Sequence, residues 1–327
     1  MSKNPLTMPC VILSAMTAVM VGTTCVFIIK NSELNDEIVA ANVSLAAADS
    51  EIFELRSAAS EMSETTSETS ADRAIENPFY IYDNGIDLIE YPPVEGAALN
   101  DYDMSLLETD NKKHKTLFGA DGEKRSRFGI DVSSYQQNID WQAVKADGVE
   151  FAIIRMGYRG YETGQLCEDK YFRRNLEGAA SAGIGTGVYF FSQAITEEEA
   201  AEEADYVISL LKETGAELSF PVIFDWEFPT DEGPARTEGL AGEMQTLCCR
   251  TFCDKIRAAG YEPMYYSTIN TALFRYDMGE LSDIPLWIAE YSKECNFTYN
   301  YKMWQYSCSG VVDGIEGLVD LNIFINE

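Results

Sequence analysis

Two carboxylates, Asp225 and Glu227, end an apolar run in the segment S-F-P-V-I-F-D-W-E-F, residues Ser219–Phe228. In a β-strand, residues i and i+2 share a face, so both acids point the same way while Trp226 points to the other side. Two acids on a buried face are costly to desolvate, and a fold usually keeps them where they meet water or a ligand. The spacing therefore predicts an acid/base site. The alternative is a structural ion pair or a loop cap.

The composition restricts which other side chains could catalyse a reaction. The chain has one histidine, His114, so a Ser-His-Asp or Cys-His catalyst and a multi-histidine metal site are both unexpected. Carboxylates are left as the catalysts, and neither a metal nor a cofactor is predicted. The 54 acidic and 24 basic residues give a formal charge of -30. This charge argues against nucleic acid as a partner, because phosphate contacts need Lys and Arg.

From residue 127 to 327, short apolar runs alternate with amphipathic stretches. The predicted strands are Phe128–Ser133, Val149–Gly157, Gly185–Ser192, Phe220–Phe228, Pro263–Ser267, Pro285–Tyr291, Lys302–Cys308 and Leu318–Phe324. The predicted helices are Trp141–Ala146, Asp169–Ala182, Glu197–Lys212, Glu238–Ala259 and a short one at Ile269–Tyr276. Strand-helix alternation indicates a parallel sheet, so this length of α/β chain predicts a TIM-like β/α barrel with eight strands and about five helices. The last three strands are joined by connections too short for a full helix.

The ends of these strands bring further acids to the same place. Catalytic groups of such barrels lie at the C-terminal ends of the strands. Asp131 ends the first predicted strand, Asp225 and Glu227 the fourth, and Asp320 the eighth. Strands one and eight are neighbours in a closed barrel, so we expect four acids at one mouth.

Side chains that suit a sugar are expected at the same mouth. Aromatic faces with polar tips match the apolar faces and hydroxyl edges of sugar rings. The expected substrate-binding residues are Tyr135, Tyr158, Tyr189, Tyr266, Trp287, Tyr291, Trp304 and Gln305. For Trp287 and Trp304, a place in the barrel core is the alternative. Four acids among aromatic residues predict a carbohydrate-cleaving enzyme.

Six motifs, in order, resemble the glycoside hydrolase family 25 lysozymes, the N-acetylmuramidases. They are G-I-D-V-S-S-Y-Q with I-D-W (Gly129–Trp141), F-A-I-I-R (Phe151–Arg155), F-D-W-E (Phe224–Glu227), P-L-W-I-A-E-Y (Pro285–Tyr291), W-Q-Y-S (Trp304–Ser307) and V-D-L-N (Val319–Asn322). The resemblance covers residues 127–327. It implies cleavage of the β-1,4 bond between N-acetylmuramic acid and N-acetylglucosamine, with peptidoglycan glycan strands as the partner.

The resemblance also implies roles for the acids. Glu227 matches the proton donor, Asp225 the acid beside it, and Asp131 and Asp320 two further acids of the site. Asp225 could act as a nucleophile or orient the 2-acetamido group of the substrate, and the resemblance favours the second route, with retention. The i, i+2 spacing alone does not decide between retention and inversion. One departure is Tyr189-Phe190-Phe191, where many family members have Tyr-His-Phe.

The N-terminal part of the chain predicts a membrane attachment. Met8–Ile29 has no charged residue and is long enough to cross the roughly 30 Å hydrocarbon core as a helix. We expect residues 1–30 to form a cytoplasmic stub and a single-pass signal anchor, with the catalytic domain outside the cell; a cleaved signal peptide and secretion are the alternative. Residues 31–126 are acidic and predict a stalk or linker that is partly disordered. Its last part, from residue 77, has scattered aromatic residues that could pack on the following domain.

Two further alternatives concern the whole domain and its cysteines. A catalytically silent barrel that binds glycan or serves as a scaffold would carry the same fold, because a fold does not guarantee a function. Cys295 and Cys308 are the pair that an oxidising environment would most readily join. Glu290, also at a strand end, is expected to be a rim residue.

Overall fold

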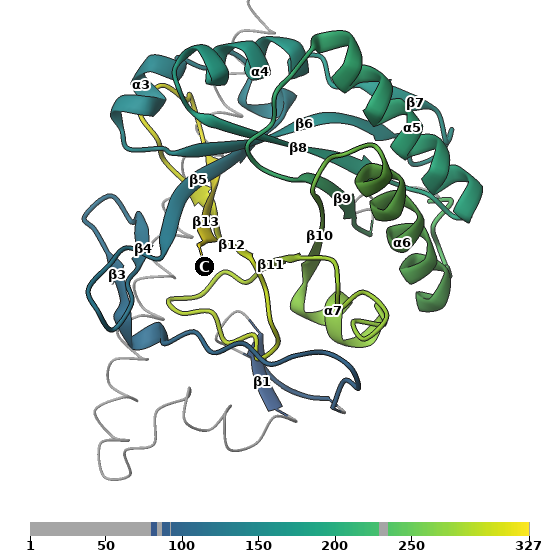
Figure 1. The fold of residues 1–327 in the computed structure, drawn as a ribbon, viewed down its shortest axis with the longest axis horizontal. Helices are drawn as coiled ribbons and strands as arrows, with labels where there is room; N and C mark the ends of the chain where they lie inside the picture. The colour runs from purple at the N-terminus through teal and green to yellow at the C-terminus, as the bar shows by residue number, and fades with distance from the viewer. Residues whose placement is uncertain (1–79, 84–86, 92, 229–234, 327) are drawn as a thin grey trace, which may run out of the picture. The chain divides into compact units, whose positions relative to one another are not determined.

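The computed structural model describes residues 80–83, 87–91, 93–228 and 235–326 (Figure 1). Its main sheet has nine strands in the order β5-β13-β12-β11-β10-β9-β8-β6-β7, and β5 also pairs with β6, which closes a barrel from all of these strands except β7 (Leu166–Glu168). The barrel strands are β5 (Ser126–Val132), β6 (Phe151–Arg159), β8 (Gly185–Ser192), β9 (Val222–Trp226), β10 (Pro263–Thr268), β11 (Leu286–Ala289), β12 (Met303–Gly310) and β13 (Val319–Ile325). The predicted barrel is confirmed.

The helices follow the first strands, as the sequence predicts. They are α3 (Trp141–Ala146), α4 (Phe172–Ser181), α5 (Glu197–Thr214), α6 (Gly242–Ala258) and α7 (Ile269–Phe274). Side chains cap three of their N-termini: Asp140 for α3, Thr196 for α5 and Thr268 for α7. In Figure 1, α3 to α6 form an arc outside β6, β8 and β9.

One strand runs against the direction that the sequence pattern suggested. β13 is antiparallel to both β12 and β5, whereas the other neighbouring barrel strands are parallel. The connection before β13 is short, and an antiparallel pair can be joined by a short turn whereas a parallel pair needs a crossover. Asp320 therefore lies at the start of its strand, not at its end as predicted. The reversed direction still brings it to the C-terminal ends of the parallel strands.

The core has two parts, one inside the barrel and one outside. Inside, Phe151, Ile153, Phe220, Ile223, Met264, Trp287 and Met303 fill the barrel below the acids. Outside, alternate residues of the same strands pack on the helices; Phe224, for example, contacts Phe252 of α6 at a ring distance of 5.2 Å. Gly129 leaves room for the Phe151 ring, because a Cβ at this position would overlap that ring. This filled interior fixes the floor of the mouth where the acids lie.

Residues 93–118, which we name the strap, pack on the barrel where β11 and β12 have no helix. The strap follows the hairpin β1 (Tyr80–Asp83) and β2 (Asp87–Glu90), and includes a 3-10 turn (Met104–Leu106) and the paired strands β3 (Leu107–Thr109) and β4 (Lys115–Leu117). Its main contacts are with the connection between β11 and β12: Asn100 Nδ2 donates to the carbonyl oxygens of Phe297 (2.6 Å) and Tyr299 (3.2 Å). Part of the segment predicted as a linker is thus folded against the barrel.

The predicted membrane span, Met8–Ile29, lies outside the residues that the structure describes. Within the described ranges, no helix combines the length and the apolar character that crossing a bilayer requires.

Candidate active site

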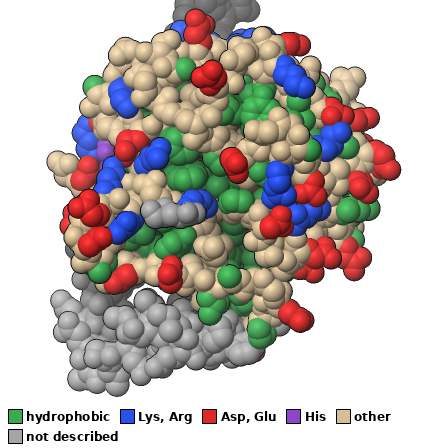
Figure 2. Space-filling view, in the orientation of Figure 1, with side chains coloured by type: hydrophobic (Ala, Val, Ile, Leu, Met, Phe, Trp, Pro, Cys, Tyr) green, Lys and Arg blue, Asp and Glu red, His purple; other side chains and the backbone are tan. Residues whose placement is uncertain are grey.

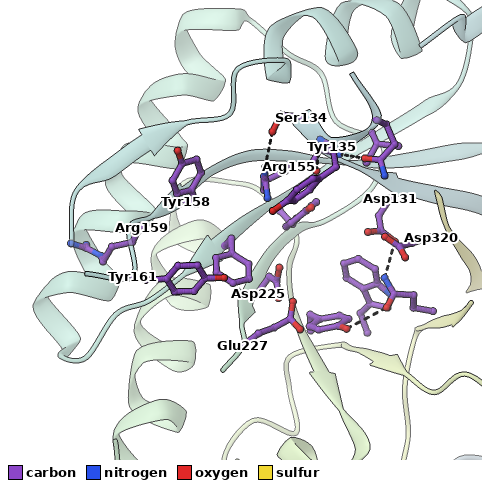
Figure 3. Close-up of a pocket in the computed structure, with 18 of the residues that line it drawn as sticks. Asp131, Ser134, Tyr135, Arg155, Tyr158, Arg159, Tyr161, Asp225, Glu227 and Asp320 are labelled. Atoms are coloured by element: carbon purple, nitrogen blue, oxygen red, sulfur yellow. Dashed lines mark hydrogen bonds between the residues drawn. The ribbon is translucent and has the colours of Figure 1, made fainter. Parts of the chain in front are cut away.

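A cavity of about 600 Å³ opens at the C-terminal ends of the parallel strands, and all four predicted acids line it (Figure 3). Asp131 comes from β5 and Asp225 from β9; Glu227 follows the last residue of β9, and Asp320 is the second residue of β13. A second hollow, of about 790 Å³, lies between the strap and the barrel, and none of these four acids lines it. The first cavity is therefore the candidate active site.

Asp131 and Asp320 face each other across the β13–β5 pair, where they are direct partners in the register. Asp131 Oδ2 accepts hydrogen bonds from Asn322 Nδ2 (2.8 Å) and Gln305 Nε2 (2.9 Å). Burial raises the pKa of Asp320 to about 9, and the neighbouring Asp131 adds to the rise. Burial also raises the pKa of Asp131, while its hydrogen bonds with Asn322, Gln305 and Asp320 oppose that rise. Asp320 is therefore a proton-bearing partner of Asp131 near neutral pH.

Asp225 and Glu227 form the second pair of acids, on the other side of the cavity (Figure 3). Burial and, after it, the charge of Asp131 raise the pKa of Glu227 to about 7. Asp225 is only 4% exposed, and burial followed by the charge of Glu227 holds its pKa well above the usual range. The positive charge of Arg155 opposes this rise at Asp225. A carboxyl group that holds its proton near pH 7 can act as a general acid.

Neutral side chains hold Asp131 in place. Gln305 Oε1 accepts from the hydroxyls of Tyr266 (3.2 Å) and Tyr291 (2.9 Å), and this fixes its Nε2 toward Asp131. On the other side, Trp287 Nε1 donates to Asn322 Oδ1 (2.9 Å), and Asn322 in turn donates to Asp131. Asn322 was not predicted as a site residue, although it lies two residues after Asp320 and therefore on the same face of β13.

Most of the expected substrate-binding residues line the cavity, and one does not. Tyr135, Tyr158, Tyr189, Tyr266, Trp287, Tyr291 and Gln305 are among the lining residues, and the Tyr135 side chain is 80% exposed. Trp304 is 0% exposed and packs outside the barrel, where its Nε1 donates to the Glu290 carbonyl oxygen (2.8 Å). Neighbours in a strand point to opposite faces, so Trp304 and Gln305 cannot both face the cavity. Trp304 was therefore wrongly predicted to bind substrate.

The same alternation bears on the Tyr189-Phe190-Phe191 departure. Tyr189 and Phe191 line the cavity, whereas Phe190 is fully buried on the helix side and contacts the Tyr206 ring at 6.1 Å. A side chain at position 190 therefore does not face the cavity in this structure.

The sequence prediction missed a basic and aromatic part of the cavity wall. Arg155, Arg159, Ser134, Tyr161 and Phe191 all line the cavity. Arg155 Nε donates to Asp169 (2.8 Å) and its Nη2 donates to Ser134 Oγ (2.9 Å). The sequence pattern predicts a helix from Asp169, but α4 begins only at Phe172. An arginine at the end of an apolar strand, as in F-A-I-I-R, was the signal that could have indicated this part of the site.

Other predicted features lie away from the cavity. Glu290 is buried, not on the rim, and it accepts hydrogen bonds from the Asn296 backbone (2.7 Å) and side chain (2.6 Å). Cys295 and Cys308 are both free thiols, so the suggested pair is not formed. Among the described residues, no cluster of three or more His, Cys, Asp or Glu side chains could hold a metal ion.

Comparison with known proteins agrees with this geometry. The family model described as glycosyl hydrolases family 25 matches residues 130–315. The chain is 29% identical to the autolytic lysozyme of Clostridium acetobutylicum over 198 aligned residues. The alignment covers 60% of this chain and 55% of that protein. It is also 29% identical to lysozyme M1 of Streptomyces globisporus over 209 aligned residues, and this alignment covers 60% of this chain and 67% of that protein. This chain thus spans little more than half the length of the Clostridium relative.

Solved structures show the same similarity. The spore cortex lytic enzyme SleM of Clostridium perfringens superposes with a TM-score of 0.52 at 25% identity, over 62% of this chain and 68% of that one. The modular autolysin LytC of Streptococcus pneumoniae, solved with a synthetic peptidoglycan ligand, gives 0.51 at 25% identity, over 75% of this chain and 56% of that one. The family match covers more than half of the chain and includes Asp131, Asp225 and Glu227; the chain therefore belongs to glycosyl hydrolases family 25.

Proposed function

We propose that this protein is a peptidoglycan hydrolase that cleaves the β-1,4 bond between N-acetylmuramic acid and N-acetylglucosamine. The observation that carries the proposal is Glu227, a carboxyl group with a pKa of about 7, beside Asp225 in a cavity walled by tyrosines. Family membership and the relatives known as an autolytic lysozyme, an autolysin and a cortex-lytic enzyme support the same substrate.

In the proposed mechanism, Glu227 donates the proton and Asp225 acts in its ionised form, which the positive charge of Arg155 favours against the effects of burial and of the charge of Glu227. Asp225 accepts a hydrogen bond from the N–H of the substrate's 2-acetamido group. This bond directs the acetamido oxygen to the anomeric carbon. As that carbon–oxygen bond forms, the glycosidic bond breaks and Glu227 donates its proton to the departing oxygen. Water then attacks the anomeric carbon, gives a proton to Glu227 and releases the acetamido group, with net retention. Asp131 and Asp320 support the charge balance of the site.

The identity of the products tests the reaction. Full-length protein is incubated with purified peptidoglycan, and the new ends are reduced with borohydride and analysed by mass spectrometry. The proposal requires reduced muramic acid and no increase in reduced glucosamine. A protein that binds the glycan without releasing ends is the silent module of the alternative. The first-formed anomer, followed by NMR, tests the stereochemistry, and an initial α-product would rule out retention.

We further propose that residues 1–30 anchor the protein in the cell membrane with the catalytic domain outside the cell. The uncharged segment Met8–Ile29 is the support for this proposal. Cell fractionation should recover the protein with membranes, and protease added to intact wall-free cells should digest the barrel. Recovery of a shortened protein in the medium would favour the secreted alternative.

A further inference from the structure

The candidate active site contains a cation whose hydrogen-bonding capacity the protein does not use up. We propose that Arg155 binds a carboxylate of the substrate and so selects glycans that carry free carboxylates over neutral glycans. This inference rests on the proposed function and specifies the substrate class of the same site.

The contacts of Arg155 hold its guanidinium in one position. Its side chain is 15% exposed, Nε donates to Asp169 (2.8 Å), and Nη2 donates to Ser134 Oγ (2.9 Å). The rings of Tyr135 and Tyr158 lie 5.3 and 5.6 Å from its Cζ atom. These contacts lower the conformational entropy lost on binding a ligand, so Arg155 is a preorganised donor.

The same contacts leave donors for a ligand. A guanidinium has five N–H groups, and within the described part of the chain Nη1 of Arg155 donates to no protein acceptor. Asp169, which takes the Nε edge, has a fully buried side chain and so occupies the position behind Arg155 rather than the cavity. Figure 3 shows Arg155 between Ser134 and the acid pair Asp225 and Glu227.

The other arginine of the cavity wall differs in this respect. Arg159 is 4% exposed, and all three of its nitrogen atoms have partners: Nε donates to Glu203 (2.7 Å), Nη1 to the Gly164 carbonyl (2.8 Å) and Nη2 to the Glu199 carbonyl (2.8 Å). Arg155 is therefore the cation of the cavity wall that can accept an anion.

The chemistry of bacterial glycans supplies two possible carboxylates. Muramic acid has a lactyl carboxylate, which is free wherever the stem peptide has been removed, and stem peptides have carboxylates of their own. Polymers of N-acetylglucosamine alone have neither. A planar carboxylate matches the guanidinium edge, and such charge-assisted hydrogen bonds are about twice as strong as neutral ones.

Comparing carboxylate-bearing and carboxylate-capped glycans tests the inference without depending on a variant. Peptidoglycan strands stripped of peptides by an amidase are assayed before and after their carboxylates are converted to amides, beside intact peptidoglycan and chitin oligosaccharides. We expect capping to lower kcat/KM of the wild-type protein by about tenfold or more, mainly through KM, as for loss of one charge-assisted hydrogen bond. Preference for stripped strands identifies the lactyl carboxylate, and preference for intact strands identifies the stem peptide.

Variants then assign the effect to Arg155. Arg155→Gln should lose the discrimination between the capped and uncapped substrates, and Arg155→Lys should keep part of it. Arg173→Gln removes the same charge from an exposed side chain paired with Glu168 and Glu213, outside the cavity, and should leave the discrimination unchanged. The discrimination is a ratio measured on one protein sample, so partial unfolding does not alter it.

Two results would overturn the inference. They are equal wild-type rates on capped and uncapped strands, and an Arg155→Gln variant that keeps the full discrimination. If the rate of that variant falls equally on both substrates with a shifted pH profile, Arg155 acts only through Asp225. Failure of the wild-type protein to cleave any glycan would instead refute the proposed function.

Discussion

At the scale of single residues, the folded chain holds carboxyl groups in an environment that favours their neutral forms. The folded-state pKa of Glu227 is about 7 against an ordinary value of 4.5. The folded state therefore binds this proton more tightly than the unfolded state does. The contribution of the Glu227 proton to the unfolding free energy is fully present below pH 4.5 and is lost as the pH rises through about 7. If Glu227 were instead the charged partner in a structural ion pair, removing its charge would destabilise the fold.

This difference gives a stability prediction for Glu227→Gln. At pH 8 the variant should unfold at a higher temperature than the wild type, with a gain in unfolding free energy of roughly 2–3 kcal/mol, because glutamine has no charge to bury. At pH 4.5 the two proteins should differ little. Thermal melts followed by circular dichroism at both pH values measure this, with the exposed Glu217→Gln as control. A lower melting temperature for Glu227→Gln at pH 8 would favour the structural role.

At the scale of elements, the strap supports the loop that carries Tyr291 into the site. The connection from Tyr291 to β12 forms hydrogen bonds with the strap along its length: the Asn100 side chain binds two of its carbonyl groups, and the Val94 amide donates to the Tyr299 hydroxyl (2.8 Å). Lys115 of β4 also lies over the rings of Trp304 (5.0 Å) and Tyr306 (5.4 Å). The strap thus covers strands that the helices leave open.

Asn100→Ala should therefore destabilise the barrel and not only the strap. The change leaves the Phe297 and Tyr299 carbonyl groups without this donor, which should lower the unfolding free energy by about 1–3 kcal/mol. Urea unfolding of the full-length protein, followed by tryptophan fluorescence, measures the loss. Asn138→Ala, an exposed change whose partner is the Arg174 side chain, is the control. An unchanged midpoint for Asn100→Ala would show that the strap does not unfold together with the barrel.

The elements that the sequence predicted well are those with strong local signals. The helices have cap residues such as Thr196 before α5, and the barrel strands are short runs rich in apolar residues. Three features that the sequence mispredicted or left open depend on tertiary structure. The direction of β13 depends on its pairing with β5, the outward position of Trp304 depends on the register of β12, and the strap is held mainly by hydrogen bonds to residues about 200 positions away.

The site was predictable to the extent that it follows the strand pattern. All four acids were expected at one mouth, because each is close to the end of an apolar run. Asn322 and Arg155, which complement them, had only weak local signals: two-residue spacing from Asp320 for Asn322, and a place at the end of an apolar run for Arg155. Ser134 had none. The function of these three residues depends on which partners the closed barrel brings to them, such as Asp169 behind Arg155.

At the scale of the whole molecule, the excess of negative charge affects stability. The formal charge is -30, although acidic and basic side chains alternate around the face in Figure 2, where apolar side chains gather near the middle. Like charges in excess repel one another in the folded state, and salt screens this repulsion. The melting temperature should therefore rise when sodium chloride is increased from 10 to about 300 mM at pH 7. A fall would mean that surface ion pairs, such as Arg250 with Asp283, outweigh the repulsion.

Glu227 is proposed to donate the proton that breaks the glycosidic bond, and the pH dependence of the cleavage rate tests this proposal directly. Release of reducing ends from purified peptidoglycan is measured from pH 4.5 to 9 for the wild-type protein and Glu227→Gln. We expect the wild-type kcat/KM to fall as the pH rises above about 7, because Glu227 loses its proton there, and Glu227→Gln to be slower by 10² to 10⁴. A Glu227→Gln variant that releases reducing ends at the wild-type rate would show that Glu227 is not the proton donor.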